Sequence, residues 1–585
     1  MVLLLRWCAA VLLLNLSGSV VIADSLPEQQ QRRVDVIQKI APSVVCVMPP
    51  DGSGGGSGVL ISADGFAISN YHVTSGAGSF LKCGLNDGNV YDAVIVGIDP
   101  TGDVALIQLL GRNDFPFCTP GDSSLVQPGD EVLALGNPFL LASDFTPTVT
   151  YGIVSGTHRY QYPAGTFLEY TDCIQIDASI NPGNSGGPLF DIQGRWIGIN
   201  GRASFEKRGR INSGAAYAIS VRQVQLFIDH LKAGRIVDHG RTDFTVRTDG
   251  NRVVVEELSD LSEAGRRGLR IGDEVVSFGG RALSSANDFK NILGIYPEGS
   301  RVPLAFRQDD GVHRITVRLS PLHEFSSAPP LPEERQPEKN PDDEAPEGLP
   351  DRHPKIAKEQ PPKPPAEYAH LFEEKTSFTN FYFNRIRTDA ILNGVYERLP
   401  SSETQRDHSW LLKVVATTAA GEHVGEIRIN ERGVGMDLAG LPPQLQPAET
   451  PAIENESSEL FGLMAGLQQW YWLFQHDRSL FADVMYFGST NLLPDDRRVS
   501  ILNIQKGAIL SRWYFADDAP LPVGVDVQLS AGVDEARLRF DQWKTGSSIP
   551  VPGRIGVVDS NSEQIRWISV DSMDAKITPS AREAL

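Results

Sequence analysis

Short apolar segments alternate with clusters of Gly, Asp, Asn and Pro about every ten residues from about residue 44 to 220. This spacing is typical of an antiparallel barrel or sandwich. A polar helix is predicted over residues 27–40 and a second helix over 221–233, so residues 24–235 form one mainly β unit. The expected strands cover residues 44–48, 58–62, 66–70, 93–98, 105–109, 131–135, 148–155, 173–176, 196–200 and 215–220.

Two further folded units follow. Residues 242–322 mix strands and helices, with strands at 252–257 and 274–278 and helices near Ala264 and over 286–293. Residues 368–585 alternate apolar and polar positions in many short segments, which predicts a meandering antiparallel sheet. A helix is expected over 460–474, and a curved sheet over a helix, as in periplasmic lipoprotein-carrier folds, suits the pattern. We read Trp470-Tyr471-Trp472 as core, with a ligand or partner groove as the alternative.

The two parts of the chain are joined by a segment that cannot form a core. Residues 329–365 contain 12 prolines mixed with Glu, Asp and Lys, a composition that favours an extended linker, which we place at 325–367. Six of the eight tryptophans lie beyond it, so the tail is folded. We expect proteolysis in the linker to release a protease-containing fragment and a stable tail.

The N-terminus has the pattern of an export signal. Arg6 precedes an apolar run, and Ala23 ends a segment of small residues before a polar stretch, so cleavage of residues 1–23 is predicted; an uncleaved anchor is the alternative. Export implies an oxidising compartment. The remaining cysteines, Cys46, Cys83, Cys118 and Cys173, form either disulfides or buried thiols, and the sequence does not decide between them.

Charge and composition narrow the function classes. The chain has 585 residues, a hydrophobic share of 41% and a net charge of −20 without a locally basic region, so nucleic-acid binding is not expected. The sequence lacks clustered His or Cys-x-x-Cys, which argues against a zinc site, and we expect no metal and no cofactor.

Three residues of the first unit suggest nucleophilic catalysis. Ser185 lies in Asn184-Ser185-Gly186-Gly187-Pro188, where glycines permit a tight turn with free amides around the hydroxyl. His72 follows a predicted strand end, and Asp103 directly precedes an apolar strand, where a carboxylate can hold an imidazole. Each signal alone has a structural explanation. Together, in the order His, Asp, Ser, they predict a serine nucleophile with its base and orienting acid.

Five blocks, three of which contain these residues, resemble the HtrA-like (DegP/DegS-type) serine proteases. They are residues 57–61, 69–73, 99–106, 136–139 and 181–189. The resemblance covers roughly residues 30–235 and implies two six-stranded barrels of the trypsin fold. It also implies that Ser185 is the nucleophile, His72 the general base and acid, and Asp103 the orienting carboxylate. The Gly183 and Ser185 amides would form the oxyanion hole, and the family suggests a trimer.

The sequence departs from the family where specificity and regulation are decided. Only residues 49–57 occupy the place of the family's long first loop, so an inactive oligomer built on that loop is not expected. Ser179, six residues before the nucleophile, carries no charge, so the first specificity pocket should not select Lys or Arg. With Ile180 and Tyr217 nearby, it should favour aliphatic residues.

The second unit resembles the PDZ domain that follows the protease in this family. Residues 253–255, 262–265 and 267–275 and Gly280 match its strand and helix pattern. The resemblance implies that peptides bind by strand addition. Asp243 stands in the carboxylate-binding loop and would oppose a C-terminal carboxylate, while Phe244 can line an apolar pocket. Recognition of C-terminal peptides and a packing or gating role therefore both remain open.

The whole architecture is mainly β: a two-barrel protease, an α+β PDZ domain, a Pro-rich linker and a β-rich C-terminal domain of unknown role. The predicted function is that of a bacterial periplasmic or secreted serine endopeptidase acting on unfolded or exposed protein segments, in protein quality control or regulated proteolysis. The alternative is a non-catalytic chaperone or PDZ scaffold on a protease fold. An intact triad favours the enzyme, because a scaffold does not need it.

Overall fold

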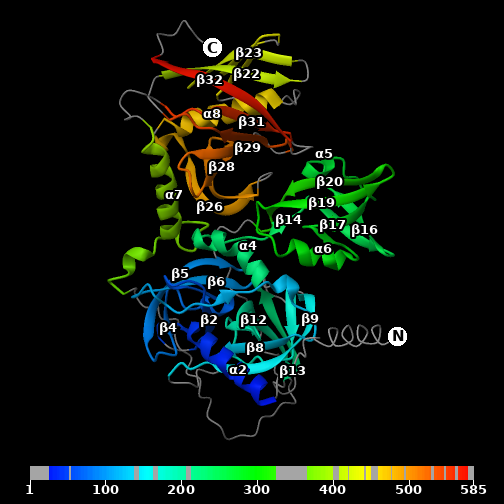
Figure 1. Cartoon of the computed structure of the whole chain (residues 1–585), viewed down its shortest axis with the longest axis vertical. Coiled ribbons are helices and arrows are strands. Elements are labelled where there is room, and N and C mark those ends of the chain that lie inside the picture. The colour runs from blue at the N-terminus through cyan, green and yellow to red at the C-terminus, as the bar shows by residue number, and fades with distance from the viewer. Residues whose placement is uncertain are drawn as a thin grey trace, which may run out of the picture.

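The chain folds into three parts that stack on one another (Figure 1). Two barrels lie at the bottom, the green α+β domain lies to the right, and the large C-terminal sheet lies at the top. The computed structural model describes residues 26–51, 54–137, 144–161, 169–205, 212–323, 365–399, 408–418, 421–440, 443–448, 459–475, 477–492, 496–528, 532–545, 549–559 and 564–577. The predicted signal peptide, 1–23, and nearly all of the predicted linker lie outside these residues.

A polar helix, α2 (Leu26–Ile40), precedes the first barrel. Six antiparallel strands close this barrel in the order β1-β2-β3-β6-β5-β4. Its interior is filled by residues such as Val45, Leu60, Ile107 and Leu81, each at most 1% exposed. The strands are β1 (Val44–Met48), β2 (Gly56–Leu60), β3 (Phe66–Ser69), β4 (Phe80–Gly84), β5 (Val90–Asp99) and β6 (Val104–Leu109).

The second barrel is built from a seven-stranded sheet, because an additional pairing of β11 with β12 closes six of its strands into a ring. The strands are β7 (Thr119–Pro120), β8 (Glu131–Gly136), β9 (Thr148–Gln161), β10 (Tyr170–Ile176), β11 (Pro188–Asp191), β12 (Arg195–Phe205) and β13 (Asn212–Ser220). One apolar cluster joins residues of both barrels, including Val59 and Leu133. The predicted two-barrel, mainly β fold is confirmed.

Helix α4 (Val221–Lys232) follows the second barrel and is capped by Ser220, whose hydroxyl accepts a hydrogen bond from the Gln223 amide. Residues 233–239, which we call the hinge, then lead into the α+β domain, where β14 (Gly240–Arg241) pairs with β21 (Ser320–Pro321). The entry and exit of this domain therefore lie side by side.

The α+β domain has a six-stranded sheet in the order β15-β16-β17-β19-β20, with β18 paired to β17. Ser285 and Asp288 form a capping box that begins helix α6, as Ser and an acidic residue three positions apart predict. The elements are β15 (Phe244–Asp249), β16 (Arg252–Leu258), α5 (Glu263–Arg266), β17 (Glu274–Phe278), β18 (Arg281–Ala282), α6 (Ala286–Leu293), β19 (Arg301–Gln308) and β20 (Gly311–Arg318).

The C-terminal domain is one antiparallel sheet of eleven strands that curves around a buried helix, α8 (Glu459–Leu473). Trp470 and Tyr471 are 0% and 2% exposed, so the aromatic run belongs to the core, as predicted. The strands are β22 (His408–Thr418), β23 (Gly421–Asn430), β24 (Gly433–Leu438), β25 (Gln444–Pro447), β26 (Asp483–Leu492), β27 (Arg497–Lys506), β28 (Ile509–Ala516), β29 (Pro522–Gln528), β30 (Ala536–Asp541), β31 (Arg554–Val558) and β32 (Ile565–Ile577).

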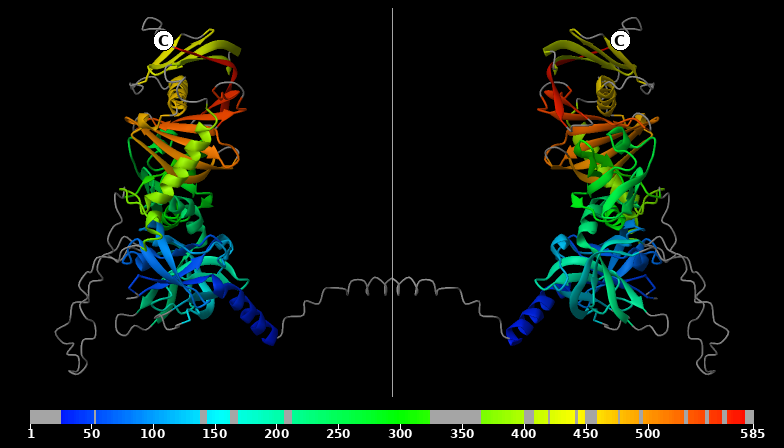
Figure 2. Two further views of the ribbon diagram at one scale, coloured as in Figure 1. Left: turned by 90° about the vertical axis from the view of Figure 1, so that its left-hand side faces the viewer. Right: turned by 90° about the vertical axis from the view of Figure 1, so that its right-hand side faces the viewer.

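The C-terminal part is not an independent tail. Helix α7 (Phe381–Tyr396), which the sequence analysis missed, runs from the barrels along the C-terminal sheet (Figures 1 and 2). The Asn384 side chain, fully buried, donates to the carbonyl oxygens of Ala233 at 2.9 Å and Tyr486 at 2.7 Å. Asn380 likewise reaches the Ile95 carbonyl in the first barrel at 2.9 Å.

The α+β domain is also held by the C-terminal sheet, through buried ion pairs. Arg318 lies 2.8 Å from Asp526 and 2.9 Å from Glu535, and Arg301 lies 2.8 Å from Glu535. Although burial alone would raise the pKa of Glu535, Arg318, Arg512 and Arg301 hold it far below its usual range. These contacts favour fragments that stay together after cleavage over the separable fragments expected from the sequence, because linker composition indicates an extended segment but not what its two ends pack against.

Candidate active site

His72 and Asp103 belong to the first barrel, and Ser185 belongs to the second. His72 lies in the single-turn helix α3 (Tyr71–Thr74), directly after β3, and Asp103 directly precedes β6. Because β3 and β6 are neighbours in the first barrel, their ends place the two side chains together. Ser185 lies just before β11 of the second barrel.

The His72 and Asp103 side chains form a hydrogen-bonded pair. His72 Nδ1 lies 2.7 Å from Asp103 Oδ2, and the His72 amide donates to Asp103 Oδ1 at 2.9 Å. Asp103 is fully buried, while the His72 side chain is 31% exposed. A buried carboxylate that holds Nδ1–H fixes the tautomer whose Nε2 is free to accept a proton.

Asp103 is held in an uncommon backbone conformation, with φ at 58°. Its carbonyl oxygen accepts from the Asn70 side chain at 2.8 Å, and the preceding turn is closed by Asp99, whose carboxylate accepts from the Gly102 amide at 2.8 Å. A Cβ on Gly102 would lie 2.2 Å from Asp99 Oδ2 and 2.9 Å from His239 Nε2. The turn therefore packs directly on the hinge histidine.

The Ser185 loop is tied to the first barrel through Ser57 of β2. The Ser57 amide donates to the Ser185 carbonyl at 2.8 Å, and its hydroxyl donates to the Gly183 carbonyl at 2.6 Å. Gly186 has φ at 84°, and a Cβ there would lie 2.2 Å from the Ser57 carbonyl, so only glycine fits this close approach. The contact fixes the nucleophile loop relative to the His72–Asp103 pair.

The Ser185 hydroxyl donates to the Gly201 carbonyl at 3.2 Å. Since a serine hydroxyl has one proton, that proton is not donated to His72 in this arrangement; rotation about χ1 redirects it. Within the described part of the chain, neither the Gly183 amide nor the Ser185 amide donates a backbone hydrogen bond. Both amides are thus available to an oxyanion, and Gly183 adopts φ at 99°.

The Tyr170 side chain contacts both Asp103 and Gly201, whose carbonyl accepts the Ser185 hydroxyl. Its hydroxyl donates to Asp103 Oδ2, so the carboxylate accepts from both Tyr170 and His72. Its ring packs so closely on Gly201 that a Cβ there would lie 2.7 Å from a ring carbon. The sequence analysis did not identify Tyr170, which lies in none of the five blocks. It included Ser57 only as part of the block 57–61, because the sequence does not reveal a partner so distant in the chain.

The three residues expected to shape specificity occupy different environments. Ser179 is exposed and its carbonyl accepts from Thr150 Oγ1 at 3.0 Å, while Tyr217 is half-buried in β13. Ile180 is only 2% exposed and belongs to the core of the second barrel. Ser179 and Tyr217 are therefore the more accessible of the three.

The α+β domain contacts the β9–β10 hairpin near this site. The Asn291 side chain of α6 donates to the His158 carbonyl at 3.0 Å and accepts from the Asp172 amide at 3.0 Å. Arg281 lies 2.9 Å from Asp172. Burial alone would raise the pKa of Asp172, but His158 and Arg281 bring it below its ordinary value.

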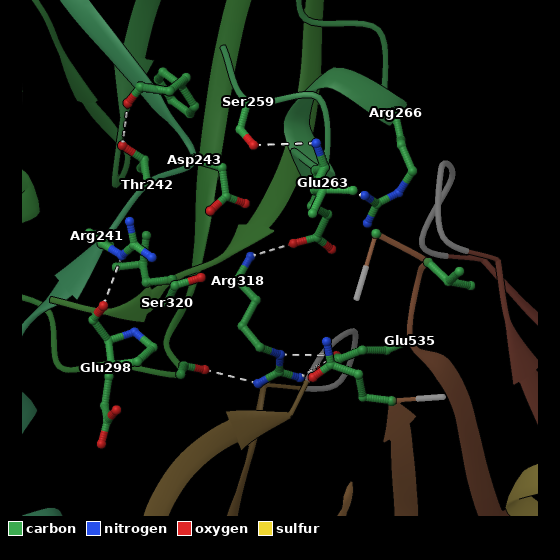
Figure 3. Close-up of a pocket in the computed structure, with 18 of the residues that line it drawn as sticks. Arg241, Thr242, Asp243, Ser259, Glu263, Arg266, Glu298, Arg318, Ser320 and Glu535 are labelled. Atoms are coloured by element: carbon green, nitrogen blue, oxygen red, sulfur yellow. Dashed lines mark hydrogen bonds and ion pairs between the residues drawn. The ribbon is translucent and has the colours of Figure 1, made fainter. Parts of the chain in front are cut away.

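Phe244, expected to line a peptide pocket, is 4% exposed and packs in the core of the α+β domain, 5.6 Å from the Phe289 ring. The neighbouring Asp243 is half-buried, and burial raises its pKa. Both residues border a cavity that opens toward the C-terminal sheet (Figure 3).

A two-barrel fold with a buried Asp–His pair in one barrel and a serine on a glycine-rich loop of the other defines the class of trypsin-like serine peptidases. Residues 56–199 match the trypsin-like peptidase domain family. Three curated relatives narrow this class to a family. It is 34% identical over 279 residues to a probable periplasmic serine endoprotease DegP-like of Chlamydia muridarum, covering 46% of this chain and 54% of that protein.

The second relative is the serine protease HTRA1 of Xenopus tropicalis, 32% identical over 49% of this chain and 66% of that protein. The third is the putative serine protease HhoB of Synechocystis, 31% identical over 47% of this chain and 70% of that protein. A solved HtrA-type protease, AlgW with a tripeptide, is 30% identical, with a TM-score of 0.40 over 49% of this chain and 96% of its own. The chain belongs to the HtrA-like serine proteases of the trypsin fold, and it spans about half the length of the first curated relatives it matches.

Proposed function

We propose that the protein is an exported serine endopeptidase that cleaves unfolded or exposed polypeptide segments through an acyl-enzyme intermediate. The observation that carries the proposal is the buried Asp103 carboxylate, 2.7 Å from His72 Nδ1, opposite Ser185 on the second barrel. In the reaction, Ser185 Oγ attacks the scissile carbonyl while His72 Nε2 takes its proton. His72 then gives that proton to the leaving amine, and water releases the acyl group by the reverse sequence.

The same family membership supports the finer proposals. Relatives named periplasmic endoproteases support a periplasmic location, for which residues 1–23 would be the signal. Among the described residues, no helix is both long and apolar enough to cross a membrane. A trimer and peptide binding by the PDZ-like domain are proposed on the resemblance. The intact set of His72, Asp103 and Ser185 favours the enzyme over a non-catalytic scaffold.

Cleavage of a disordered protein tests this function. The full chain from residue 24 should degrade casein, and the new C-termini should be mainly aliphatic residues because Ser179 brings no charge to the pocket. Cleavage only after Lys or Arg would contradict the pocket proposal. Casein that stays intact under conditions in which the protein is folded would contradict the endopeptidase function.

A further inference from the structure

The C-terminal domain holds the backbone of the hinge, residues 233–239. The Thr379 and Asn380 amides donate to the Gly234 carbonyl at 2.9 and 3.1 Å. The Thr379 hydroxyl donates to the Arg235 carbonyl at 3.1 Å. Gly234 has φ at 72°, and a Cβ on it would lie 2.1 Å from the Asn380 carbonyl oxygen. The chain just before α7 therefore lies directly across the hinge, at a position where only glycine fits.

A side chain of the C-terminal sheet also holds the hinge. Phe487 belongs to β26, which lies beside α4 where the sheet meets the barrels (Figure 1). The Arg235 guanidinium carbon lies 3.9 Å from the centre of the Phe487 ring, a cation–π contact, and Arg235 Nη1 donates to the Phe487 carbonyl at 3.1 Å. The same guanidinium pairs with Glu298 of the α+β domain. Arg235 is 6% exposed and Phe487 is 9% exposed, so the C-terminal sheet and the α+β domain together fix a buried hinge side chain.

The hinge supports the turn that presents Asp103. The Ile98 amide donates to the Arg235 carbonyl at 3.1 Å, and the Val237 amide donates to the Ile98 carbonyl at 2.8 Å. The hinge thus pairs in parallel with the end of β5. Asp99 follows Ile98 directly and closes the turn to Asp103. A shift of the hinge therefore shifts this turn.

The Asp103 turn depends on such support. A residue other than glycine keeps a positive φ, here 58°, only where the surrounding contacts fix it. The other catalytic side chain of the first barrel is supported differently, because a cavity of about 340 Å³ lies between α3, which carries His72, and the segment 372–379. The C-terminal domain thus faces α3 across a cavity but contacts the hinge directly.

We infer that the C-terminal domain positions the catalytic acid. Phe487 and Thr379 hold the hinge, which in turn keeps Asp103 in place. Both are positioning residues, because they contact the hinge and not the reacting atoms. A displacement of about 1 Å at a catalytic group costs about 100-fold in rate, even when its cause lies far from the chemistry. The inference rests on the proposed function and gives the C-terminal domain a part in it.

Two measurements on the chain from residue 24 test the inference. The first is the rate at which a fluorophosphonate probe labels Ser185, which requires an activated serine but no peptide substrate. The second is kcat and KM for a peptide that the wild-type chain cleaves. A thermal melt of each variant shows whether it is folded at the assay temperature.

Phe487→Ala removes the ring from Arg235 and keeps the backbone carbonyl. It should lower the labelling rate and kcat about 10- to 100-fold and leave KM nearly unchanged, because the acid is displaced and the substrate site is not. Phe540→Ala is the control, since Phe540 is 4% exposed in the same domain and packs on Trp513 at 6.2 Å between ring centroids. A folded Phe540→Ala chain should keep the wild-type rates.

Thr379→Val and Thr379→Ser form a second, milder pair. Thr379→Val removes the donor to the Arg235 carbonyl and should lower both rates roughly 2- to 10-fold, the factor that corresponds to one hydrogen bond. Thr379→Ser keeps a hydroxyl and should restore them. If Phe487→Ala does not fold, this pair decides the inference.

Wild-type labelling and kcat in the folded Phe487→Ala and Thr379→Val chains would overturn the inference. A rise in KM alone would also overturn it, because the two residues would then act on substrate binding. Casein left intact by a wild-type chain that labels at Ser185 would contradict only the proposed function, and the labelling rates of the variants would still decide the inference. A folded wild-type chain that does not label would overturn both.

Discussion

The His239 imidazole lies 2.9 Å from Asp99 Oδ1, although the two residues are 140 positions apart and belong to the hinge and to the first barrel. Both side chains are buried, at 3% and 0% exposure. The His239 backbone also accepts from the Leu322 amide at 3.0 Å, at the exit of the α+β domain. One residue therefore links that domain to the turn that presents Asp103.

We expect Asp99→Asn to lower turnover about 10- to 100-fold, because a misplacement of about 1 Å at a catalytic group costs on this order. Peptide turnover is measured at about 25 °C, and a separate thermal melt shows whether the variant is folded at that temperature. Asp92→Asn is the control, since Asp92 lies on the same strand and pairs with Lys82 at 2.7 Å near the surface. A folded Asp99→Asn enzyme with wild-type turnover would show that the turn does not depend on this contact.

The same contact has a defined pH dependence. Burial alone would lower the pKa of His239, but Asp99, with Asp238 and Glu169, raises it above its ordinary value. A raised pKa in the folded state stabilises the fold below the unfolded pKa, and this contribution is lost as pH rises through the folded pKa. Thermal stability of wild type relative to His239→Gln should therefore fall as the pH rises above about 6.5, the ordinary pKa of histidine. A difference that stays constant across this range would contradict an ion pair at His239.

Tyr170→Phe should lower turnover by up to roughly 30-fold with little change in KM, because a hydrogen bond to a charged group contributes about 2 kcal/mol. The substitution removes the donor to Asp103 Oδ2 and keeps the ring that packs on Gly201. Tyr151→Phe is the control, since the Tyr151 hydroxyl bonds Glu131 on the outside of the same barrel. Equal turnover in Tyr170→Phe and Tyr151→Phe would remove Tyr170 from the positioning of Asp103.

Cleavage within residues 324–364 should leave two fragments that stay together near pH 7. The pKa of Asp526 is lowered, since Arg539, Arg301 and Arg318 outweigh the effect of burial. Its stabilising contribution is present above the unfolded pKa and lost only as pH falls below about 4. Size-exclusion chromatography should show one species near neutral pH and separation in strong acid. Glu535→Ala, which leaves buried arginines uncompensated at a cost of about 3–5 kcal/mol, should separate the fragments more readily.

The four cysteines of the chain from residue 24 should react as thiols only after unfolding. All four are free and buried, and burial raises the pKa of Cys46 to about 11 and of Cys118 to about 12. The thiolate that reacts is therefore scarce at neutral pH. A disulfide reagent should modify none of these cysteines quickly in the native protein and four in denaturant. Fewer than four in denaturant without reductant would indicate disulfides.

Local patterns in the sequence predicted most strands and the helices α4, α6 and α8. The glycine-rich turn at Ser185 and the strand ends at His72 and Asp103 were visible because each lies in a short motif. Helix α7 was missed because its apolar residues do not form one face: it contacts the barrels on one side and the C-terminal sheet on the other.

Contacts between distant segments were not predictable in the same way. Tyr170, Ser57 and His239 act on residues 67 to 140 positions away. Their side chains have ordinary roles in isolation, and only the closure of the barrels and the docking of the hinge bring them to the catalytic residues. The cavity between the α+β domain and the C-terminal sheet has the same origin, since part of its lining comes from beyond the linker.

Covalent labelling of Ser185 tests the central claim most directly. A fluorophosphonate probe reacts with a serine only when a base and oxyanion donors activate its hydroxyl. We expect one label per folded wild-type chain, located at Ser185 by peptide mapping, none on Ser185→Ala, and a strong decrease on Asp103→Asn, for which a triad predicts a turnover loss of about 10⁴-fold. Absence of label on folded wild type, or an equal label on Ser185→Ala, would contradict the assignment.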